Sequence, residues 1–339
     1  MRSTTAPPSF KLVALLLFCL LPSIAAAQVP QFDSLYVFGD SLADNGNILM
    51  QTKAMRMDPP VPPSVTPHRT YFDGRFSNGY IAFEYLWQRL SGHRLDSPQA
   101  LKPFLAAPAL PKTGATNFAF GGTGTPYLDQ TPGGFYSPGL KGQIELFRVA
   151  LRGRQPSSRA LYVISTGAND YRLEFNVPMS PEEVIGNIEQ SIVSLYRLGA
   201  RHVMVVDLPD LGMIPANGGD PAATQLSLYH NWLLDQALAR LRSQYPSLHL
   251  IPVKLDPLFQ ELVHVKLMEA RFSLLDAFAP STPGLSSCLF VNPAACSDAP
   301  PILFNGFFGF IFWDVAHPTT EAHRFLGDYA YKQLELAYP

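Results

Sequence analysis

Short apolar runs alternate along this chain with longer segments of helical periodicity. The runs are four to six residues long with few polar side chains, and they cover residues 35–38, 117–120, 161–164, 202–206 and 248–253. Runs of this length and character are typical of strands that are buried on both faces of a sheet. Helical patterns cover residues 80–90, 181–198, 222–245 and 319–336. Pro181 and Pro318 mark the starts of two of these segments, and Gly199 follows the end of one.

This alternation predicts parallel strands, because parallel neighbours need a crossover connection and a helix usually supplies it. We therefore expect an α/β fold, a three-layer α/β/α sandwich around a mainly parallel five-stranded sheet of the flavodoxin-like type. In such sheets ligands bind beyond the carboxyl ends of the strands. Ser41, Gly122 and Asn169 each follow a predicted strand within a few residues. The topology therefore predicts that these three positions share one rim of the sheet.

The N-terminus has the pattern of a removable export signal. Arg2 and Lys11 are basic, residues 12–21 are apolar, and residues 25–27 are three alanines that fit a cleavage site. The apolar run is too short to span a bilayer, which takes about 20 residues. We expect residues 1–27 to be a signal peptide and residues 28–339 to form one domain. The product would then be secreted or periplasmic, without a stable membrane anchor.

Charge and cysteine usage narrow the function classes. The formal net charge is −2 and no basic stripe runs along the chain, so a nucleic-acid partner is not expected. Neither a zinc-binding spacing nor a P-loop is present. Cys19 belongs to the predicted signal, which leaves Cys288 and Cys296 to form a disulfide in an oxidising compartment. The sequence leaves the oligomeric state open.

Four short blocks carry the functional signal, and they occur in a fixed order. They are Gly39-Asp40-Ser41-Leu42, Asn117 to Gly122, Gly167-Ala168-Asn169-Asp170 and Asp314-Val315-Ala316-His317. This set resembles the GDSL esterase/lipase family, also called the SGNH hydrolases. Residues 73–79 and 208–212 also look like segments of longer family members, so the resemblance spans residues 34–335.

The first and last blocks supply the parts of a serine nucleophile. The resemblance implies that Ser41 is the nucleophile and that His317 is its general base. Histidine suits proton transfer around neutral pH. Asp314 lies three residues before His317, so one turn of chain can aim its carboxylate at the imidazole. His323 is the rival base, but it lies inside the predicted last helix and lacks an acid at matching spacing.

The remaining blocks supply donors for the negative oxygen of a tetrahedral intermediate. The resemblance implies an oxyanion hole built from the backbone N–H of Ser41, a glycine of the second block and the side-chain amide of Asn169. Gly122 aligns best with the family donor, and Gly121 is the alternative.

Nearby acidic residues have a simpler structural interpretation. Asp40 and Asp170 resemble a carboxylate pair for glycoside hydrolysis, but we expect them to hold local structure instead. Asp44, Asn45 and Asn47 lack the spacing of a calcium loop and are expected to hold the turn after the nucleophile.

The function that follows from the resemblance is a secreted serine esterase or lipase that cleaves carboxylic esters through an acyl-enzyme. Its ester substrate would be a lipid, a short-chain ester or an acylated glycan, and no metal or organic cofactor is expected. One alternative is an acyltransferase that passes the same acyl group to an alcohol. Another is a non-catalytic lipid- or glycan-binding protein on the same fold.

Overall fold

The computed structural model describes residues 29–64, 70–131, 133–172, 178–255, 257–258 and 311–338. The predicted signal peptide and the predicted Cys288–Cys296 pair lie outside these residues. The strands are β1 Ser34–Gly39, β2 Lys102–Pro103, β3 Gly114–Asn117, β4 Leu128–Gln130, β5 Tyr136–Pro138, β6 Ala160–Ser165, β7 His202–Val206 and β8 His249–Val253. The α-helices are α1 Asn47–Ala54, α2 Ala82–Ser91, α3 Leu140–Leu151, α4 Pro181–Leu198, α5 Pro221–Gln244 and α9 Thr320–Ala337. Short 3-10 turns cover Phe104–Ala106, Asn169–Tyr171, Leu211–Met213 and Pro215–Asn217.

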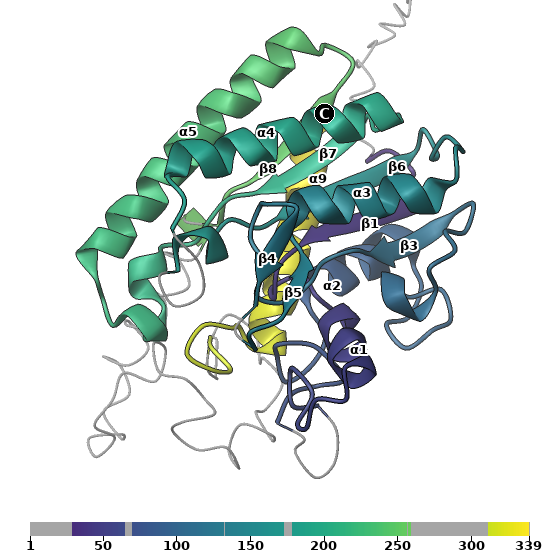
Figure 1. Ribbon diagram of the computed structural model, residues 1–339. Coiled ribbons are helices and arrows are strands. Elements are labelled where there is room, and N and C mark those ends of the chain that lie inside the picture. The colour runs from purple at the N-terminus through teal and green to yellow at the C-terminus, as the bar shows by residue number, and fades with distance from the viewer. Residues whose placement is uncertain are drawn as a thin grey trace, which may run out of the picture.

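Six strands form one parallel sheet in the order β2-β3-β1-β6-β7-β8 (Figure 1). Without β2 this is the flavodoxin-like order, so the predicted α/β class and topology are confirmed. The predicted count of five strands was wrong by one. The extra strand, β2, pairs only Lys102 and Pro103 with β3. A lysine and a proline form no apolar run, and proline fits in a sheet because β2 is an edge strand.

The second predicted strand lies earlier than expected. Residues 117–120 carry the apolar pattern, but β3 ends at Asn117. Beyond that point the chain still follows β1, because Phe118 N donates to Val37 O at 2.7 Å. The N–H of Ala119 instead donates to the side chain of Asn117 at 2.9 Å. Regular strand pairing therefore ends at Asn117, where a side-chain oxygen replaces a backbone carbonyl as the acceptor.

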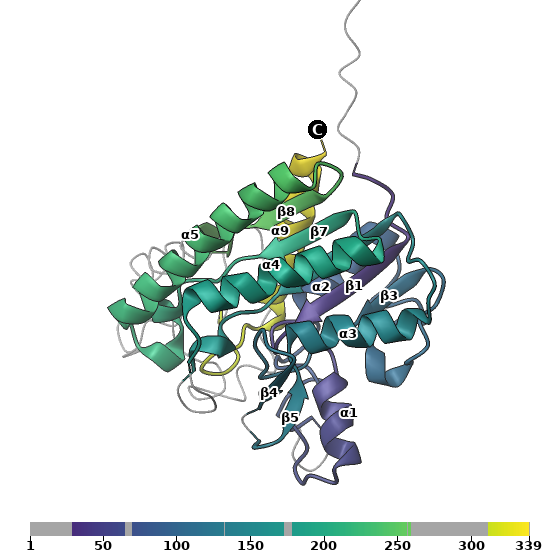
Figure 2. The same ribbon diagram turned by 45° about the horizontal axis from the view of Figure 1, so that its top comes forward.

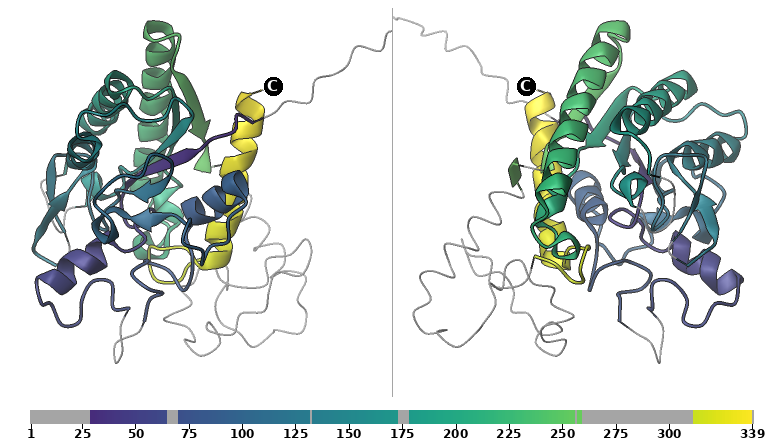
Figure 3. Two further views of the ribbon diagram at one scale, coloured as in Figure 1. Left: turned by 90° about the vertical axis from the view of Figure 1, so that its right-hand side faces the viewer. Right: turned by 60° about the vertical axis from the view of Figure 1, so that its left-hand side comes forward.

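Two helical layers cover the sheet, one on each face. Tyr36 and Phe38 of β1 pack in a core with α3, α4 and α5, whereas Leu35 and Val37 pack in a second core with α2 and α9. Figures 1 and 2 show α3, α4 and α5 in front of the strands, and the left view of Figure 3 shows yellow α9 on the opposite side. Burial on both faces explains why the strands are apolar at successive positions.

None of the helices in the described ranges combines the length and the apolar character needed to cross a bilayer.

The topology gathers three of the four blocks at one end of the sheet. β1 lies between β3 and β6, with Val37 paired to Asn117 and Gly39 paired to Ser165. All three strands are parallel, so the segments that follow them emerge side by side. This is the topological switch point of the sheet, where open α/β folds place their ligands.

Candidate active site

Ser41 lies in a tight turn directly after β1. The carbonyl of Asp40 accepts from the N–H groups of Ala43 and Asp44 at 3.0 and 2.9 Å, and the Asp40 carboxylate accepts from Leu42 N at 3.0 Å. Gly39 precedes this turn because an added Cβ there would collide with the backbone of β6. The turn occupies the backbone groups around Ser41, and the N–H of Ser41 itself has no acceptor among the described residues.

The structure brings Ser41, His317 and Asp314 into one hydrogen-bonded line. His317 Nε2 lies 2.9 Å from Ser41 Oγ, and His317 Nδ1 lies 2.7 Å from Asp314 Oδ2. The loop that carries the acid and the imidazole is closed by a bridge between Phe312 and Pro318. Asp314 Oδ1 also accepts from the backbone N–H of His317 at 2.8 Å, which fixes the carboxylate within its own turn.

The charge of Asp314 determines which ring nitrogen of His317 carries the proton. Burial raises the pKa of Asp314, but the charge of His317 and several hydrogen bonds outweigh it and lower the pKa to about 2. An ionised carboxylate accepts hydrogen bonds only, so His317 Nδ1 must carry the proton. In the neutral imidazole Nε2 then has a lone pair, and the Ser41 hydroxyl donates to it.

His323, the alternative base considered from the sequence, does not contact Ser41. Its ring is buried between α9 and α2, where Nδ1 accepts from Ala82 N at 3.3 Å. Burial and the charge of His317 lower the pKa of His323 to about 3. The ring is therefore a neutral packing group.

The second block is tied to the nucleophile turn by side-chain amides. Asn117 Nδ2 donates to Ala43 O at 2.6 Å and to Asn45 Oδ1 at 3.0 Å. Asn47 Nδ2 donates to Asn117 O at 2.8 Å and to Ala119 O at 2.9 Å. These bonds hold the segment after β3 against the segment after β1, as expected from asparagines that stabilise a turn.

The hydrogen bonds of Asp44 distinguish the backbone N–H groups of the two glycines in the second block. Its carboxylate accepts from Gly46, Asn47 and Ile48 at the start of α1, and from Gly121 N at 2.9 Å. The predicted role of Asp44 in holding this turn is therefore confirmed. The N–H of Gly121 is occupied, whereas the next N–H along the chain has no acceptor among the described residues.

Asn169 joins the third block to the second. Its Nδ2 donates to Thr123 O at 3.1 Å, which leaves one of its two amide hydrogens without a partner in the described part of the chain. The neighbouring Asp170 accepts from Thr125 N at 2.9 Å and from Thr125 Oγ1 at 2.7 Å. Asp170 thus holds local structure, as expected.

Three buried carboxylates surround the site and share one electrostatic property. Burial raises the pKa of Asp40 to about 7 and the pKa values of Asp44 and Asp170 to about 6, although hydrogen bonds from backbone N–H groups oppose the shift. The pKa of Asp314 is lowered to about 2, so Asp314 is the carboxylate of the site that stays ionised when the pH falls below the pKa values of these three groups.

Several residues of the site carried no clear signal in the sequence. Tyr71 donates its hydroxyl to Asp314 Oδ2 at 2.7 Å, and the Phe76 ring lies against the His317 ring with centroids 5.0 Å apart. Gln143 of α3 bonds to both backbone groups of Gly39, each at 2.8 Å. A tyrosine, a phenylalanine and a glutamine have no fixed spacing to a catalytic group, although Phe76 falls within the 73–79 segment that resembles the family.

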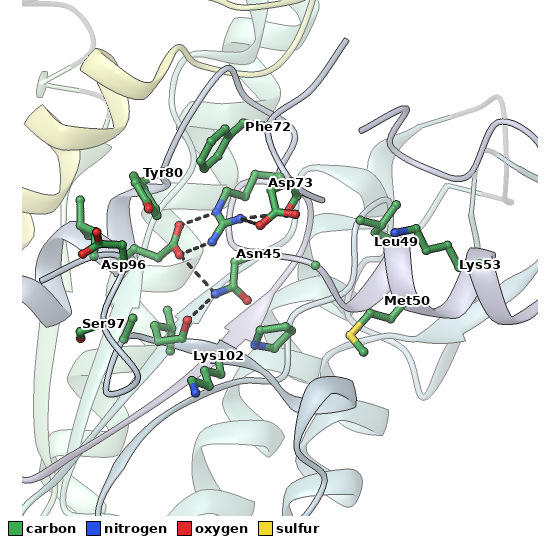
Figure 4. A pocket seen from close by; sticks show the side chains of 17 residues that line it. Asn45, Leu49, Met50, Lys53, Phe72, Asp73, Tyr80, Asp96, Ser97 and Lys102 are labelled. Carbon is green, nitrogen blue, oxygen red and sulfur yellow. Dashed lines mark hydrogen bonds and ion pairs between the residues drawn. The ribbon is translucent and has the colours of Figure 1, made fainter. Parts of the chain in front are cut away.

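A cavity of about 390 Å³ lies beside Asn45 and the start of α1 (Figure 4). Its lining includes Asn45, Lys53, Phe72, Tyr80 and Lys102, but neither Ser41 nor His317. The cavity therefore does not include the predicted nucleophile Ser41, and the candidate site is the rim where Ser41 meets His317.

Within the described ranges, no group of three or more histidine, cysteine, aspartate or glutamate side chains is arranged to hold a metal ion.

Comparisons with known proteins find relatives that align with most of this chain. A GDSL esterase/lipase of Arabidopsis thaliana is 27% identical over 336 residues, which cover 89% of this chain and 88% of that protein. Acetylajmalan esterase 2 of Rauvolfia serpentina is 28% identical over 366 residues, with 92% of this chain and 93% of that protein covered. Among solved structures, an acetylxylan esterase from Geobacillus stearothermophilus covers 90% of this chain and 95% of its own, at 11% identity and a TM-score of 0.45. The profile of the GDSL-like lipase/acylhydrolase family matches residues 35–330. The chain therefore belongs to this family of carboxylic ester hydrolases.

Proposed function

We propose that the protein is an exported serine esterase in which Ser41 is the nucleophile, His317 the general base and Asp314 the residue that orients it. The observation that carries the proposal is the hydrogen-bonded line from Ser41 Oγ to His317 Nε2 and from His317 Nδ1 to Asp314. A non-catalytic binding protein has no need for a hydroxyl, an imidazole and a carboxylate that are hydrogen-bonded in series.

The proposed reaction uses protein groups alone. Ser41 Oγ attacks the ester carbonyl carbon while its proton passes to His317 Nε2, which gives a tetrahedral intermediate with a negative oxygen. The proton then passes from Nε2 to the leaving alkoxide, and the carbon–oxygen bond breaks to give the acyl-enzyme. Water repeats the sequence with His317 as base, which releases the acid and restores Ser41.

We assign the oxyanion hole to the N–H of Ser41, the N–H of Gly122 and the amide of Asn169. The support for Gly122 over Gly121 is that Gly121 N already donates to Asp44. Donors of this kind are effective because they are fixed before the charge develops, so no reorganisation is needed during the reaction.

Export and the disulfide belong to the same proposal. The basic start, the short apolar run and the three alanines support cleavage after Ala27 and release of residues 28–339 to a secreted or periplasmic location. Oxidation in that compartment favours a bond between Cys288 and Cys296. The N-terminal sequence of the exported protein and its mass before and after reduction test both points.

Acetyl and other short-chain esters are the first substrates to examine, because one relative is named as an acetylajmalan esterase. A series of p-nitrophenyl esters of increasing chain length, compared with an acetylated polysaccharide, separates short-chain, lipid and glycan preferences. The same assay with added alcohol tests the acyltransferase alternative, since a transferase diverts the acyl group from water to the alcohol.

The decisive experiment replaces Ser41 by alanine. We expect Ser41→Ala to abolish turnover of p-nitrophenyl acetate and to abolish covalent labelling by a fluorophosphonate, with the folded state unchanged by circular dichroism. Ser194→Ala is the matched control, because Ser194 lies on the exposed side of α4 and its hydroxyl bonds to Gln190 O. Near-wild-type turnover by Ser41→Ala would refute the assignment.

A further inference from the structure

Asp314 receives one hydrogen bond from a distant part of the chain. Its other donors are Ala316 N, His317 N and His317 Nδ1, which all belong to the turn that carries the carboxylate. Within the described ranges, Tyr71 is the one donor to Asp314 from outside that turn, with its hydroxyl 2.7 Å from Oδ2. Oδ2 is also the oxygen nearer to His317 Nδ1, so phenol and imidazole share a single acceptor atom.

The phenol is suited to be a permanent donor. Burial and the charge of Asp314 raise the pKa of Tyr71 above its ordinary value of 10. Tyr71 therefore stays protonated over the pH range in which esterase activity is measured. Its hydroxyl remains a hydrogen-bond donor to Asp314, and of these two donors only the imidazole titrates in that range. A neutral donor at this place spreads the charge of the carboxylate without adding a second positive group.

The backbone around Tyr71 holds the phenol in place. Tyr71 N donates to Pro63 O at 2.9 Å, Phe72 N donates to Ser77 O at 2.9 Å, and Arg75 N donates to Phe72 O at 2.9 Å. The turn from Tyr71 to Ser77 is therefore closed by its own hydrogen bonds, so the hydroxyl is not on a swinging side chain at the end of a free loop.

A buried ion pair anchors the same turn. Arg75 donates from Nε and Nη2 to the two carboxylate oxygens of Glu84 at 2.8 and 2.6 Å. Its guanidinium also lies 5.2 Å from the ring centroids of both Phe72 and Tyr80. Figure 4 shows these two aromatic side chains close to each other. Breaking a buried pair is costly, because one charge is then left uncompensated.

The turn also contacts the acid–base loop at three further places. The Phe76 ring packs on the His317 ring at an interplanar angle of 32°, and Ser77 Oγ donates to Pro318 O at 2.9 Å. Asn78 Oδ1 accepts from Thr320 N at 2.8 Å, at the start of α9. One segment far away in sequence thus contacts the acid, the base and the beginning of the helix that follows them.

We propose that Tyr71 is a positioning residue of the esterase, which holds the Asp314 carboxylate in the orientation that aligns His317 with Ser41. This inference rests on the proposed function of Ser41, His317 and Asp314. Without the phenol, Oδ2 keeps a single donor, His317 Nδ1, and the orientation of the carboxylate depends on groups of its own turn alone. Tyr71 acts on the reaction through Asp314 and does not touch the reacting ester.

The test is the Tyr71→Phe variant, which removes one oxygen atom and keeps the ring. We expect kcat on p-nitrophenyl acetate to fall by about tenfold, because a hydrogen bond to a charged group is lost, while KM changes little. The carboxylate then carries more uncompensated charge and holds a protonated imidazole more strongly. The acid limb of the kcat/KM profile is therefore expected to move to higher pH, which a purely structural role would not produce.

The other ionisable groups that act on the imidazole are Asp40, from the nucleophile turn, and His323, from α9. The variant leaves both unchanged. Tyr85→Phe is the matched control, because the Tyr85 hydroxyl is also partly buried and lies 2.8 Å from Thr320 Oγ1, between α2 and α9, but does not bond to Asp314. Tyr85→Phe is expected to keep the wild-type kcat and pH profile.

A second variant covers the case in which Tyr71→Phe does not fold. Incorporation of 3-fluorotyrosine at position 71 keeps the ring and the hydroxyl but makes the phenol a stronger donor. The acid limb is then expected to move to lower pH, opposite to the shift in Tyr71→Phe. Wild-type kcat and an unmoved acid limb in either folded variant would overturn the inference.

Fluorophosphonate labelling separates this inference from the proposed function. If the wild-type protein is not labelled at Ser41, the proposed function fails, and the inference fails with it. If Ser41 of the wild-type protein is labelled and Tyr71→Phe is labelled at the same rate, with wild-type kcat and pH profile, then the role of Tyr71 alone is wrong.

Discussion

Gly121 lies where the Phe76 ring passes over the backbone, and this close approach leads to a specific prediction for Gly121→Ala. A Cβ added at Gly121 would lie 2.6 Å from Cζ of Phe76 and closer still to Cε2. Carbon atoms in contact are about 3.5–4.0 Å apart, so the ring has to move by about 1 Å. The backbone at Gly121 is outside the left-handed region, so alanine adds a methyl group without backbone strain.

The movement matters because the Phe76 ring also packs against His317, with centroids 5.0 Å apart. Overpacking of this kind costs about 1–3 kcal/mol of folding free energy. A displacement of a catalytic group by about 1 Å costs about 100-fold in rate. We therefore expect Gly121→Ala to lower the free energy of unfolding by about 1–3 kcal/mol and kcat by about 100-fold, with a smaller effect on KM.

The assay combines steady-state kinetics on p-nitrophenyl acetate with urea unfolding. Gly186→Ala on α4 is the matched control, because an added Cβ there meets nothing within 4 Å. This control should keep the wild-type kcat and equal or exceed the wild-type stability. In a Phe76→Leu background the ring is gone, so the stability loss caused by Gly121→Ala should shrink by about 1 kcal/mol. Equal losses in both backgrounds, or wild-type kcat in Gly121→Ala, would refute the reasoning.

Three further variants test the site and its supports. Asn169→Ala removes a proposed oxyanion donor and should lower kcat by about 10²–10³, measured by kinetics. Loss of its bond to Thr123 O should lower the free energy of unfolding by only about 1 kcal/mol, measured by calorimetry. Asp40→Asn addresses the Asp40 pKa, which burial raises to about 7 from 3.8. Stability from such a group is fully present below pH 3.8 and is lost as pH rises through 7, so Asp40→Asn should gain on the wild type in urea unfolding between those values. Arg75→Met leaves Glu84 buried without its partner and should cost about 3–5 kcal/mol of unfolding free energy, part of which Arg75→Met/Glu84→Gln should recover.

Each of these expectations has a contrary outcome. Asn169→Ala with kcat within threefold of the wild type would remove that amide from the oxyanion hole. A stability difference between Asp40→Asn and the wild type that stays constant with pH would mean that Asp40 titrates normally in the folded protein. Arg75→Met with unchanged unfolding free energy would show that the Arg75–Glu84 pair does not anchor its turn.

The architecture was largely predictable because its strands are buried on both faces. Apolar runs at 161–164 and 203–206 strongly favoured central strands, and β6 and β7 lie there. Edge elements follow other rules. Lys102 and Pro103 pair with β3 through backbone groups alone, and nothing in their side chains indicates it. The apolar pattern therefore identifies five strands, the edge strand β8 included, and misses the two-residue edge strand β2.

The candidate site likewise contains residues that the sequence predicts and residues that it does not. Asp314 and His317 are three residues apart, so a single turn fixes their geometry and the sequence displays it. Tyr71 reaches Asp314 across 243 residues, and no local pattern records that contact. The choice between Gly121 and Gly122 likewise depends on where Asp44 lies in space, since its carboxylate occupies one of the two N–H groups.

The distance in sequence between Ser41 and His317 has a consequence for the cell that makes the protein. The two residues are 276 positions apart, yet Oγ and Nε2 are 2.9 Å apart once the chain is folded. A ribosome adding about 5–20 residues per second needs about 15–55 s to pass from one to the other. Under the proposed roles, the emerging polypeptide has a nucleophile without its base throughout that interval. Hydrolysis would then begin only after the segment that carries His317 has been made and has packed against the end of β1.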